Sequence, residues 1–447
     1  MNQAKVRFSR EIPVRHEVDV FVAGGGPAGV AAALAARRQG MNVFMAEAQA
    51  CFGGMGTVGL VPAFMRLTDG VNFLADGVGR EVYEKMKQFA SDWGNPIPAD
   101  FPGEYVTINV EALKRVYDDL VVDSGAKFAF ETQVIGIEAE GGQVEYAICS
   151  AKSGMYAVRA KVFVDASGDG DFCAWAGAPY ELGDANGNLM PGTLCSLWAD
   201  VDWERVHGRD DRALEQAFAD GVFTIQDRHL PGMWRVGEHV AGGNVGHTFG
   251  VDGTDESSLT KALLWGRRSL REYERYYKEY LEGFERMRLA ATGGLLGLRE
   301  TRRILGDYVL CLEDFKQRAV FEDEIGRYAY PVDIHASSPD KVSFAKFEEE
   351  FASLRYRDGE SYGIPYRTLT PRGLQNVLVA GRCVSTDRFL QGSLRVMPGC
   401  YITGQAAGAA AALAVEMGRG VHEVEVKELQ RRLKGMGAYL PNFKEAE

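Results

Sequence analysis

The stretch VDVFVAGGGPAGVAAALAARR, residues 18–38, decides the fold of this chain. An apolar run at residues 18–23 predicts a strand, and the alanine-rich residues 28–38 predict a helix. Between them Gly24, Gly26 and Gly29 have the G-x-G-x-x-G spacing. The first glycine permits a tight turn, the second lets a pyrophosphate approach the backbone, and the third lets the helix pack on the strand. The stretch therefore predicts a dinucleotide site whose phosphates meet a helix N-terminus.

A second apolar run at residues 41–46 continues this βαβ opening and ends at Glu47. A carboxylate at this position can accept hydrogen bonds from the adenosine ribose hydroxyls, and it would repel a 2′-phosphate. Glu47 and the glycines together indicate a dinucleotide, but they do not separate NAD from FAD.

Composition and charge bound the class of protein. The chain has 447 residues, of which 46% are hydrophobic, and a formal net charge of -12. This is an enzyme-sized globular chain of two or three domains, and its negative charge argues against nucleic acid or an anionic membrane as the main partner. We expect neither a signal peptide nor a membrane span, because no apolar run is long enough. Seven scattered cysteines without a C-x-x-C pair predict a cytoplasmic protein with no metal centre.

The rest of the chain returns to the first pattern after a long excursion. Alternating segments at 127–139, 144–151 and 156–159 predict an antiparallel meander that precedes a buried strand at 162–166. A long polar helix is predicted over 257–287, and the buried-strand pattern reappears at 376–380.

Four further segments resemble one known family. They are CFGGMGT at 51–57, VFVDASGDGD at 162–171, NVLVAGRCVS at 376–385 and GQAAG at 404–408. In this order and context they resemble the FAD-dependent oxidoreductases of the glutathione-reductase-like superfamily, and more distantly the fumarate reductase and succinate dehydrogenase flavoproteins. The resemblance covers nearly the whole chain.

The resemblance implies FAD as cofactor. It also implies an α/β fold, in which a Rossmann-like FAD-binding domain with a β-meander crossover carries an inserted mixed α+β substrate domain. We place the FAD domain at 1–66, 105–180 and 365–420, the substrate domain at 67–104 and 181–364, and a C-terminal helical tail at 421–447.

We expect the residues that hold FAD to lie in these segments, and the helix that opens at Gly404 to face the flavin with its N-terminus. The predicted cofactor-binding residues are Gly24, Gly26, Pro27, Ala28, Gly29, Glu47, Ala48, Gly53, Gly54, Met55, Val134, Ala166, Gly168, Asp171, Gly381, Arg382, Gly404 and Gln405.

Three side chains are candidates for substrate chemistry. Arg395 lies just before the final helix, in a segment that resembles the one with which fumarate reductase flavoproteins present an arginine to a carboxylate. His247 sits among glycines in a loop where a base could reach a substrate. Arg299, together with Arg302 and Arg303, could bind an acidic substrate. A role for these residues in salt bridges and packing remains the alternative.

We therefore predict an FAD-dependent oxidoreductase that transfers a hydride between a small organic substrate and flavin N5. A carboxylated substrate is one option. No second G-x-G-x-x-G is evident, so the electron acceptor is unknown and a homo-oligomer is left open. The alternatives are a flavin-binding protein with a non-redox or scaffold role and a flavin monooxygenase. Arg382 counts against the latter, because aromatic hydroxylases of this superfamily typically carry an aspartate after that glycine.

Overall fold

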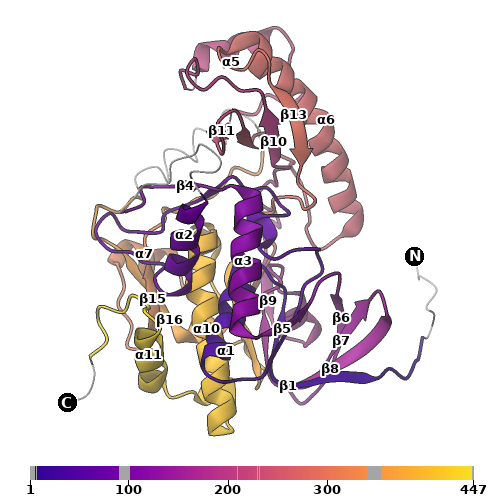
Figure 1. Ribbon diagram of the computed structural model, residues 1–447, viewed down its shortest axis with the longest axis vertical. Helices are drawn as coiled ribbons and strands as arrows, with labels where there is room; N and C mark the ends of the chain where they lie inside the picture. The colour runs from indigo at the N-terminus through magenta and orange to yellow at the C-terminus, as the bar shows by residue number, and fades with distance from the viewer. Residues whose placement is uncertain are drawn as a thin grey trace.

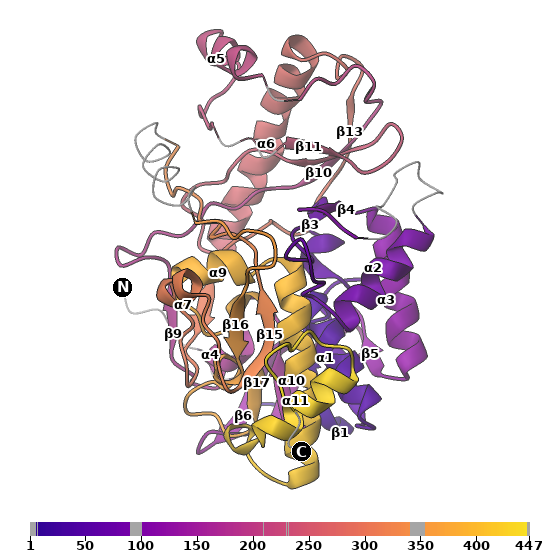
Figure 2. The same ribbon diagram turned by 90° about the vertical axis from the view of Figure 1, so that its left-hand side faces the viewer.

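The computed structural model describes residues 6, 8–89, 101–208, 210–228, 230, 232–339 and 354–444. Figure 1 shows a larger body built around one sheet, with a smaller unit of strands and two helices above it. Figure 2, turned by 90°, shows the same division.

The larger body contains a parallel sheet of five strands. Its order is β5 (Lys127–Ala129), β2 (Val43–Ala46), β1 (Val14–Ala23), β8 (Gly154–Asp165) and β17 (Val377–Val379). Most of these strand residues are buried, as expected where helices cover a parallel sheet. The predicted α/β fold with a Rossmann-like domain is confirmed.

The meander differs in detail from the predicted one. Its strands are β6 (Gln133–Glu140), β7 (Gln143–Ala151) and the first part of β8, paired antiparallel. Residues 127–129, which we had included, instead pair parallel with β2. The strands predicted at 156–159 and 162–166 are one strand, because β8 turns from β7 toward β1 without a break.

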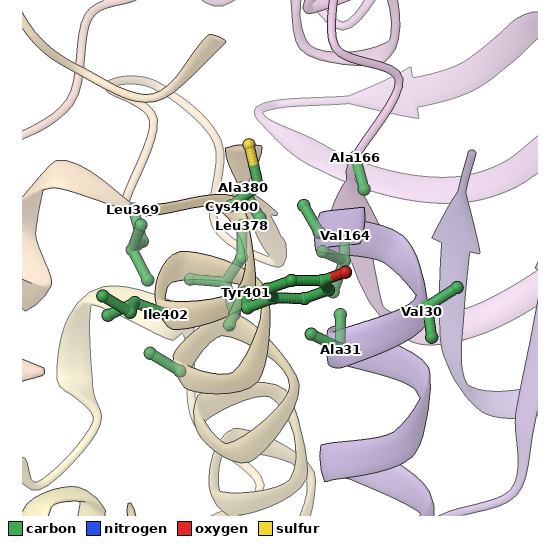
Figure 3. Close-up of a cluster of buried hydrophobic side chains, with 14 of the residues drawn as sticks. Val30, Ala31, Val164, Ala166, Leu369, Leu378, Ala380, Cys400, Tyr401 and Ile402 are labelled. Carbon is green, nitrogen blue, oxygen red and sulfur yellow. The ribbon is translucent and has the colours of Figure 1, made fainter. Parts of the chain in front are cut away.

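Helices α1 (Pro27–Arg38) and α10 (Met397–Met417) pack closely against each other beside the sheet. Figure 3 shows Ala31 of α1 and Tyr401 of α10 in one apolar cluster with Val164 of β8 and Leu378 of β17. A Cβ built on Gly404 would overlap the backbone of Ala28. The same holds for Gly408 and Ala32, one turn along.

The final helix therefore begins at Met397 and not at Gly404, as we had predicted. The glycine pattern at 404–408 marks a helix–helix contact about two to three turns inside α10. Sequence alone does not distinguish this use of glycine from a helix start, since both require a residue without a side chain.

The smaller unit is an antiparallel sheet of β11 (Gly232–Arg235), β12 (Ala241–Asn244), β10 (Ser196–Ala199) and β13 (Arg288–Thr292). Its helices are α5 (Asp211–Ala219) and α6 (Glu256–Tyr280). These elements share an apolar core of their own, supplied by residues between Leu194 and Leu296.

The two cores bear on the predicted domain boundaries. Residues from 304 onward contribute to the larger core, among them Ile325 and Tyr362, although we had assigned 181–364 to the substrate domain. The packing therefore favours a shorter second domain. Its division from the first stays a prediction.

The predicted substrate-domain segment 67–104 also contributes to the larger core. Its residues 90–100 lie outside the described residues. Helix α2 (Val78–Gln88) packs into the larger core through Val82 and Tyr83.

The remaining helices and strands connect these parts. They are η1 (Gly54–Gly56), β3 (Ala63–Phe64), β4 (Val106–Thr107), α3 (Val110–Ser124), α4 (Asp171–Trp175), β9 (Tyr180–Leu182), β14 (Arg302–Ile304), α7 (Leu312–Gln317), β15 (Glu324–Tyr328), β16 (Tyr362–Pro365), η3 (Tyr366–Thr368), η4 (Gly381–Cys383), α9 (Arg388–Leu394), η5 (Val421–Glu423) and α11 (Val426–Gly435). Within the described ranges, no helix is both long and apolar enough to cross a bilayer.

The contact between α1 and α10 predicts the effect of one methyl group. Gly404→Ala should lower the free energy of unfolding by about 1–3 kcal/mol, because the new Cβ meets backbone that cannot move aside. Urea unfolding followed by circular dichroism measures the change. Gly435→Ala is the matched control, since a Cβ there meets no atom within 4 Å. Equal stability of the two variants would contradict the close packing.

Candidate functional site

A cavity of about 640 Å³ lies at the carboxyl ends of the parallel strands, where the larger body meets the smaller unit. Ala23, Ala46 and Ala380 line it from the ends of β1, β2 and β17. Trp234 and Asn244 of the smaller sheet close it from the other side. This is where ligands bind in open α/β sheets.

The first glycines of the motif shape one end of this cavity. Gly24 has φ +94°, and a Cβ there would lie 2.7 Å from the carbonyl oxygen of Ala166. Gly26 is the N-cap residue of α1, so no side chain caps the start of this helix. A Cβ built on Gly26 would meet open space. The first-turn N–H groups of α1 are therefore available to an anion, which fits a pyrophosphate.

Glu47 is buried at the same end of the cavity. Its Oε1 accepts a hydrogen bond from the N–H of Gln49 at 2.7 Å, and its Oε2 accepts one from the N–H of Gly25 at 2.5 Å. Burial raises the pKa of Glu47, although these N–H groups oppose the shift. Each carboxylate oxygen keeps a second lone pair, so Glu47 can also accept hydrogen bonds from ribose hydroxyls.

Most of the predicted cofactor-binding residues line this one cavity. They are Gly24, Gly26, Pro27, Ala28, Glu47, Ala48, Gly54, Met55, Val134, Ala166, Gly168, Asp171, Gly381 and Arg382. Two others support its walls without lining it. Gly29 packs on the carbonyl of Gly24, and Gly53, with φ +102°, packs against Thr57 and Tyr117.

Gly404 and Gln405, also predicted as cofactor-binding residues, do not line the cavity. Gly404 lies against the backbone of α1, and the Gln405 Oε1 accepts a hydrogen bond from the N–H of Val78 at 2.8 Å. Gln405 thus caps α2. The N-terminus of α10 reaches the cavity at Val396 and Met397.

Arg382 ties the cofactor end of the cavity to the chain that leads into the smaller unit. Its guanidinium donates to the carbonyl of Gly168 at 3.0 Å and to Asp169 Oδ1 at 2.5 Å. It also donates to the carbonyl of Leu298 at 2.5 Å. Arg382, which stands where aspartate is more usual, therefore links two walls of the cavity through hydrogen bonds.

The three predicted arginines have different environments. Arg302 pairs with Asp171 at 2.6 Å, and Arg303 pairs with Glu300 at 2.6 Å. Arg299 is buried in the cavity wall and forms no ion pair in the part of the chain that the structure describes. The alternative role in salt bridges thus describes Arg302 and Arg303 but not Arg299.

Arg299 is held by neutral acceptors. Its Nη1 donates to the carbonyl of Pro191 and to Thr193 Oγ1, both at 2.9 Å, and its Nε donates to His335 Nε2 at 3.1 Å. Burial and the nearby charge of Arg395 lower its pKa to about 10. Arg299 therefore remains a cation at neutral pH, fixed in direction and without a close counter-ion.

Arg395 also lines the cavity, beside Asp333. Its Nη2 donates to Asp333 Oδ2 at 2.6 Å, while its buried Nε has no hydrogen-bond partner among the described residues. Burial opposes ionisation of Asp333, but His335, when it is protonated, and Arg395 outweigh it and hold the pKa of that carboxyl well below its usual range.

His247 is not in an open loop, as we had predicted. It is buried and does not line the cavity, and its Nδ1 lies 2.9 Å from Asp227 Oδ2. Its Nε2 lies 3.1 Å from His335 Nδ1. Burial lowers the pKa of His247, and Asp227 only partly offsets this.

Sequence reasoning missed His335, Asp333 and Tyr330, which line the cavity beside the two arginines. They follow β15 and belong to no recognised motif. A signal was present, since Asp333 and His335 are two residues apart in a chain with only seven histidines. Within the described residues, no group of His, Cys, Asp and Glu is arranged to hold a metal ion.

The position of the Glu47 carboxylate leads to a prediction for FAD affinity. Glu47→Gln should weaken FAD binding by about 10–100-fold, because a charged acceptor is lost from the ribose position. The dissociation constant, from titration of apoprotein with FAD by flavin fluorescence, measures this. Glu17→Gln, on the exposed part of β1, should bind FAD as the wild type does. Unchanged affinity in Glu47→Gln would contradict the assignment.

Solved structures with a similar arrangement were found at low sequence identity. A geranylgeranyl bacteriochlorophyll reductase-like protein from Thermoplasma acidophilum has 16% identity and a TM-score of 0.49, over 94% of this chain and 83% of that one. A p-nitrophenol 4-monooxygenase from Pseudomonas putida has 12% identity and a TM-score of 0.48, over 95% and 91%. L-proline dehydrogenase from P. horikoshii has 12% identity and a TM-score of 0.42, over 95% and 99%. A search of curated proteins found no match.

The sequence model of one protein family, described as FAD dependent oxidoreductase, matches residues 19–433. The match runs from β1 through α11, and so spans both units and every wall of the cavity. It confirms the family resemblance, the enzyme class and the cofactor that the motifs predicted. The chain belongs to the FAD-dependent oxidoreductase family, and its cofactor is FAD.

Proposed function

We propose that this enzyme transfers a hydride between a small carboxylated organic substrate and FAD. The observation that carries the proposal is Arg299, a buried cation in the wall of the cavity that also contains the dinucleotide motif, with no ion-pair partner among the described residues. When bound, FAD supplies a two-electron hydride acceptor or donor at its N5 atom.

Arg299 is suited to bind and orient a carboxylate. A buried charge is costly unless it is paired, and the four hydrogen-bond acceptors of Arg299, on Pro191, Thr193, Asn244 and His335, only partly offset that cost. A substrate carboxylate would supply the missing charge, and the planar guanidinium would fix its direction. The unpartnered Nε of Arg395 offers a further donor in the same wall.

The rest of the cavity suits a small carbon skeleton. Beyond the polar cluster, Val61, Met65, Trp234, Leu259 and Leu296 line it. Such walls exclude water and contact apolar carbon, while the polar groups fix orientation. His335, also in the wall, is the titratable side chain at which a proton can be held.

An anaerobic titration tests the proposal. The purified yellow holoenzyme would be mixed with small hydroxy acids, amino acids and dicarboxylates while its flavin absorbance near 450 nm is recorded. We expect a carboxylated compound to bleach this band and its amide or ester not to do so. Bleaching only by uncharged compounds would overturn the carboxylate assignment, and a flavin that no compound reduces would favour a non-redox role.

Loss of the Arg299 guanidinium should weaken binding of the carboxylated compound that reduces the flavin. Arg299→Lys keeps a charge but loses the paired donors, so KM or Kd should rise by about 10–100-fold while the FAD content stays unchanged. Steady-state kinetics and the ratio of flavin to protein absorbance provide the measurements. Arg267→Lys, at an exposed position of α6, is the matched control. Equal KM values in the two variants would show that Arg299 does not bind the substrate.

A further inference from the structure

One atom of the cavity wall, His335 Nε2, faces two partners that make opposite demands on it. Arg299 Nε lies 3.1 Å away, and Asp333 Oδ1 lies 3.3 Å away. A guanidinium only donates hydrogen bonds, and an ionised carboxylate only accepts them. His335 Nε2 must therefore be bare to bind Arg299 and protonated to bind Asp333, so the two contacts belong to different protonation states.

The far side of the ring determines where the other proton of His335 lies. Asp227 accepts from His247 Nδ1, and burial keeps His247 neutral, so His247 Nε2 carries no proton. That bare nitrogen can only accept from His335 Nδ1, 3.1 Å away. These tautomers are assigned from the hydrogen-bond network. With these tautomers Nδ1 of His335 keeps its proton, and Nε2 is the nitrogen that can gain or lose one.

We propose that a substrate carboxylate binds at Arg299 together with one proton, which His335 Nε2 takes up. In the free enzyme Arg299 donates to the bare Nε2. When a carboxylate becomes an acceptor for Arg299, Nε2 is released, takes a proton from solvent and donates it to Asp333. The balance is one carboxylate and one proton taken up, with no bond broken in the protein. This step rests on the proposed function, and it leaves a proton in the wall beside the reacting substrate.

The charged groups around His335 agree with this coupling. Asp333 and Tyr330 lie on its own segment, Arg299 donates to it from another segment, Arg395 pairs with its neighbour Asp333, and Asp227 lies on the far side of His247. The positive charges of Arg299 and Arg395 oppose a proton on His335, whereas the carboxylate of Asp333 favours one. A bound carboxylate neutralises one of these positive charges and so favours that proton.

Calorimetry on the holoenzyme provides the first test. Oxalate is a suitable probe because it has no C–H bond to donate as hydride and stays ionised from about pH 6 to about pH 9. Titration in HEPES and in Tris, whose ionisation enthalpies differ, gives the number of protons taken up without a small competing anion in the buffer. We expect a value that approaches one, and an oxalate Kd that rises about tenfold per pH unit between the pKa values of the free and bound forms.

Variants locate the proton. His335→Gln cannot be protonated, so its oxalate Kd should not vary with pH in that interval. Asp333→Asn removes the acceptor of the protonated state and should move the interval to lower pH. His247→Gln should keep the coupling, and so should His239→Gln, whose side chain is 70% exposed. Flavin content and circular dichroism report folding for each variant.

The possible failures are distinguishable. Binding of oxalate to the wild type without proton uptake would overturn this inference and leave the carboxylate site intact. A pH dependence that persists in His335→Gln, or that is lost in His247→Gln alone, would assign the proton to another group and overturn it as well. If the wild type does not bind oxalate even at millimolar concentration, the inference fails together with the anion site on which it rests.

Discussion

The parallel register of the main sheet is the constraint on which the site depends. Ala23 lies opposite both Ala46 and Asp165, and Val379 lies opposite Asp165. Whatever follows these residues must therefore emerge at one edge, although the strands are separated by up to about 350 residues of chain. Gly24, Glu47, Ala166 and Gly381 are close together at the cofactor end of the cavity for this reason.

The same reasoning explains what the sequence could predict. The glycine turn, the Glu47 carboxylate and the strand at 376–380 are local patterns, each tied to a buried strand, so their positions follow from the fold. The prediction for Gly404 failed because a glycine in a helix has two uses, and only the packing of α10 on α1 distinguishes them. His335 was missed because its partners, Arg299 and His247, come from other segments and no spacing along the chain records their meeting.

Burial and pairing separate the arginines that the sequence grouped together. Arg303 is buried but pairs with Glu300, and Arg302 pairs with Asp171 at a more exposed position. Arg299 is buried beside neutral acceptors, and the nearest carboxylates, Asp333 and Asp227, act on it only at longer range. Arginines that are paired with carboxylates add to the structure, whereas a buried arginine that lacks one creates a demand for an anion. This difference in pairing depends on tertiary contacts, so a sequence motif does not contain it.

The hydrogen-bonded series Asp227, His247 and His335 also joins the two units of the molecule. Asp227 and His247 lie among residues of the smaller core, whereas His335 follows β15 and its neighbour Ile334 belongs to the larger core. The bond between the two rings, at 3.1 Å, is close to the upper limit for a good hydrogen bond, so a displacement of 1 Å between the units would break it. The hydrogen bond that orients the His335 ring therefore depends on how the two units are placed relative to each other. Because the cavity lies at the same junction, the arrangement of the two units that encloses the cavity is also the arrangement in which the two histidines are hydrogen-bonded.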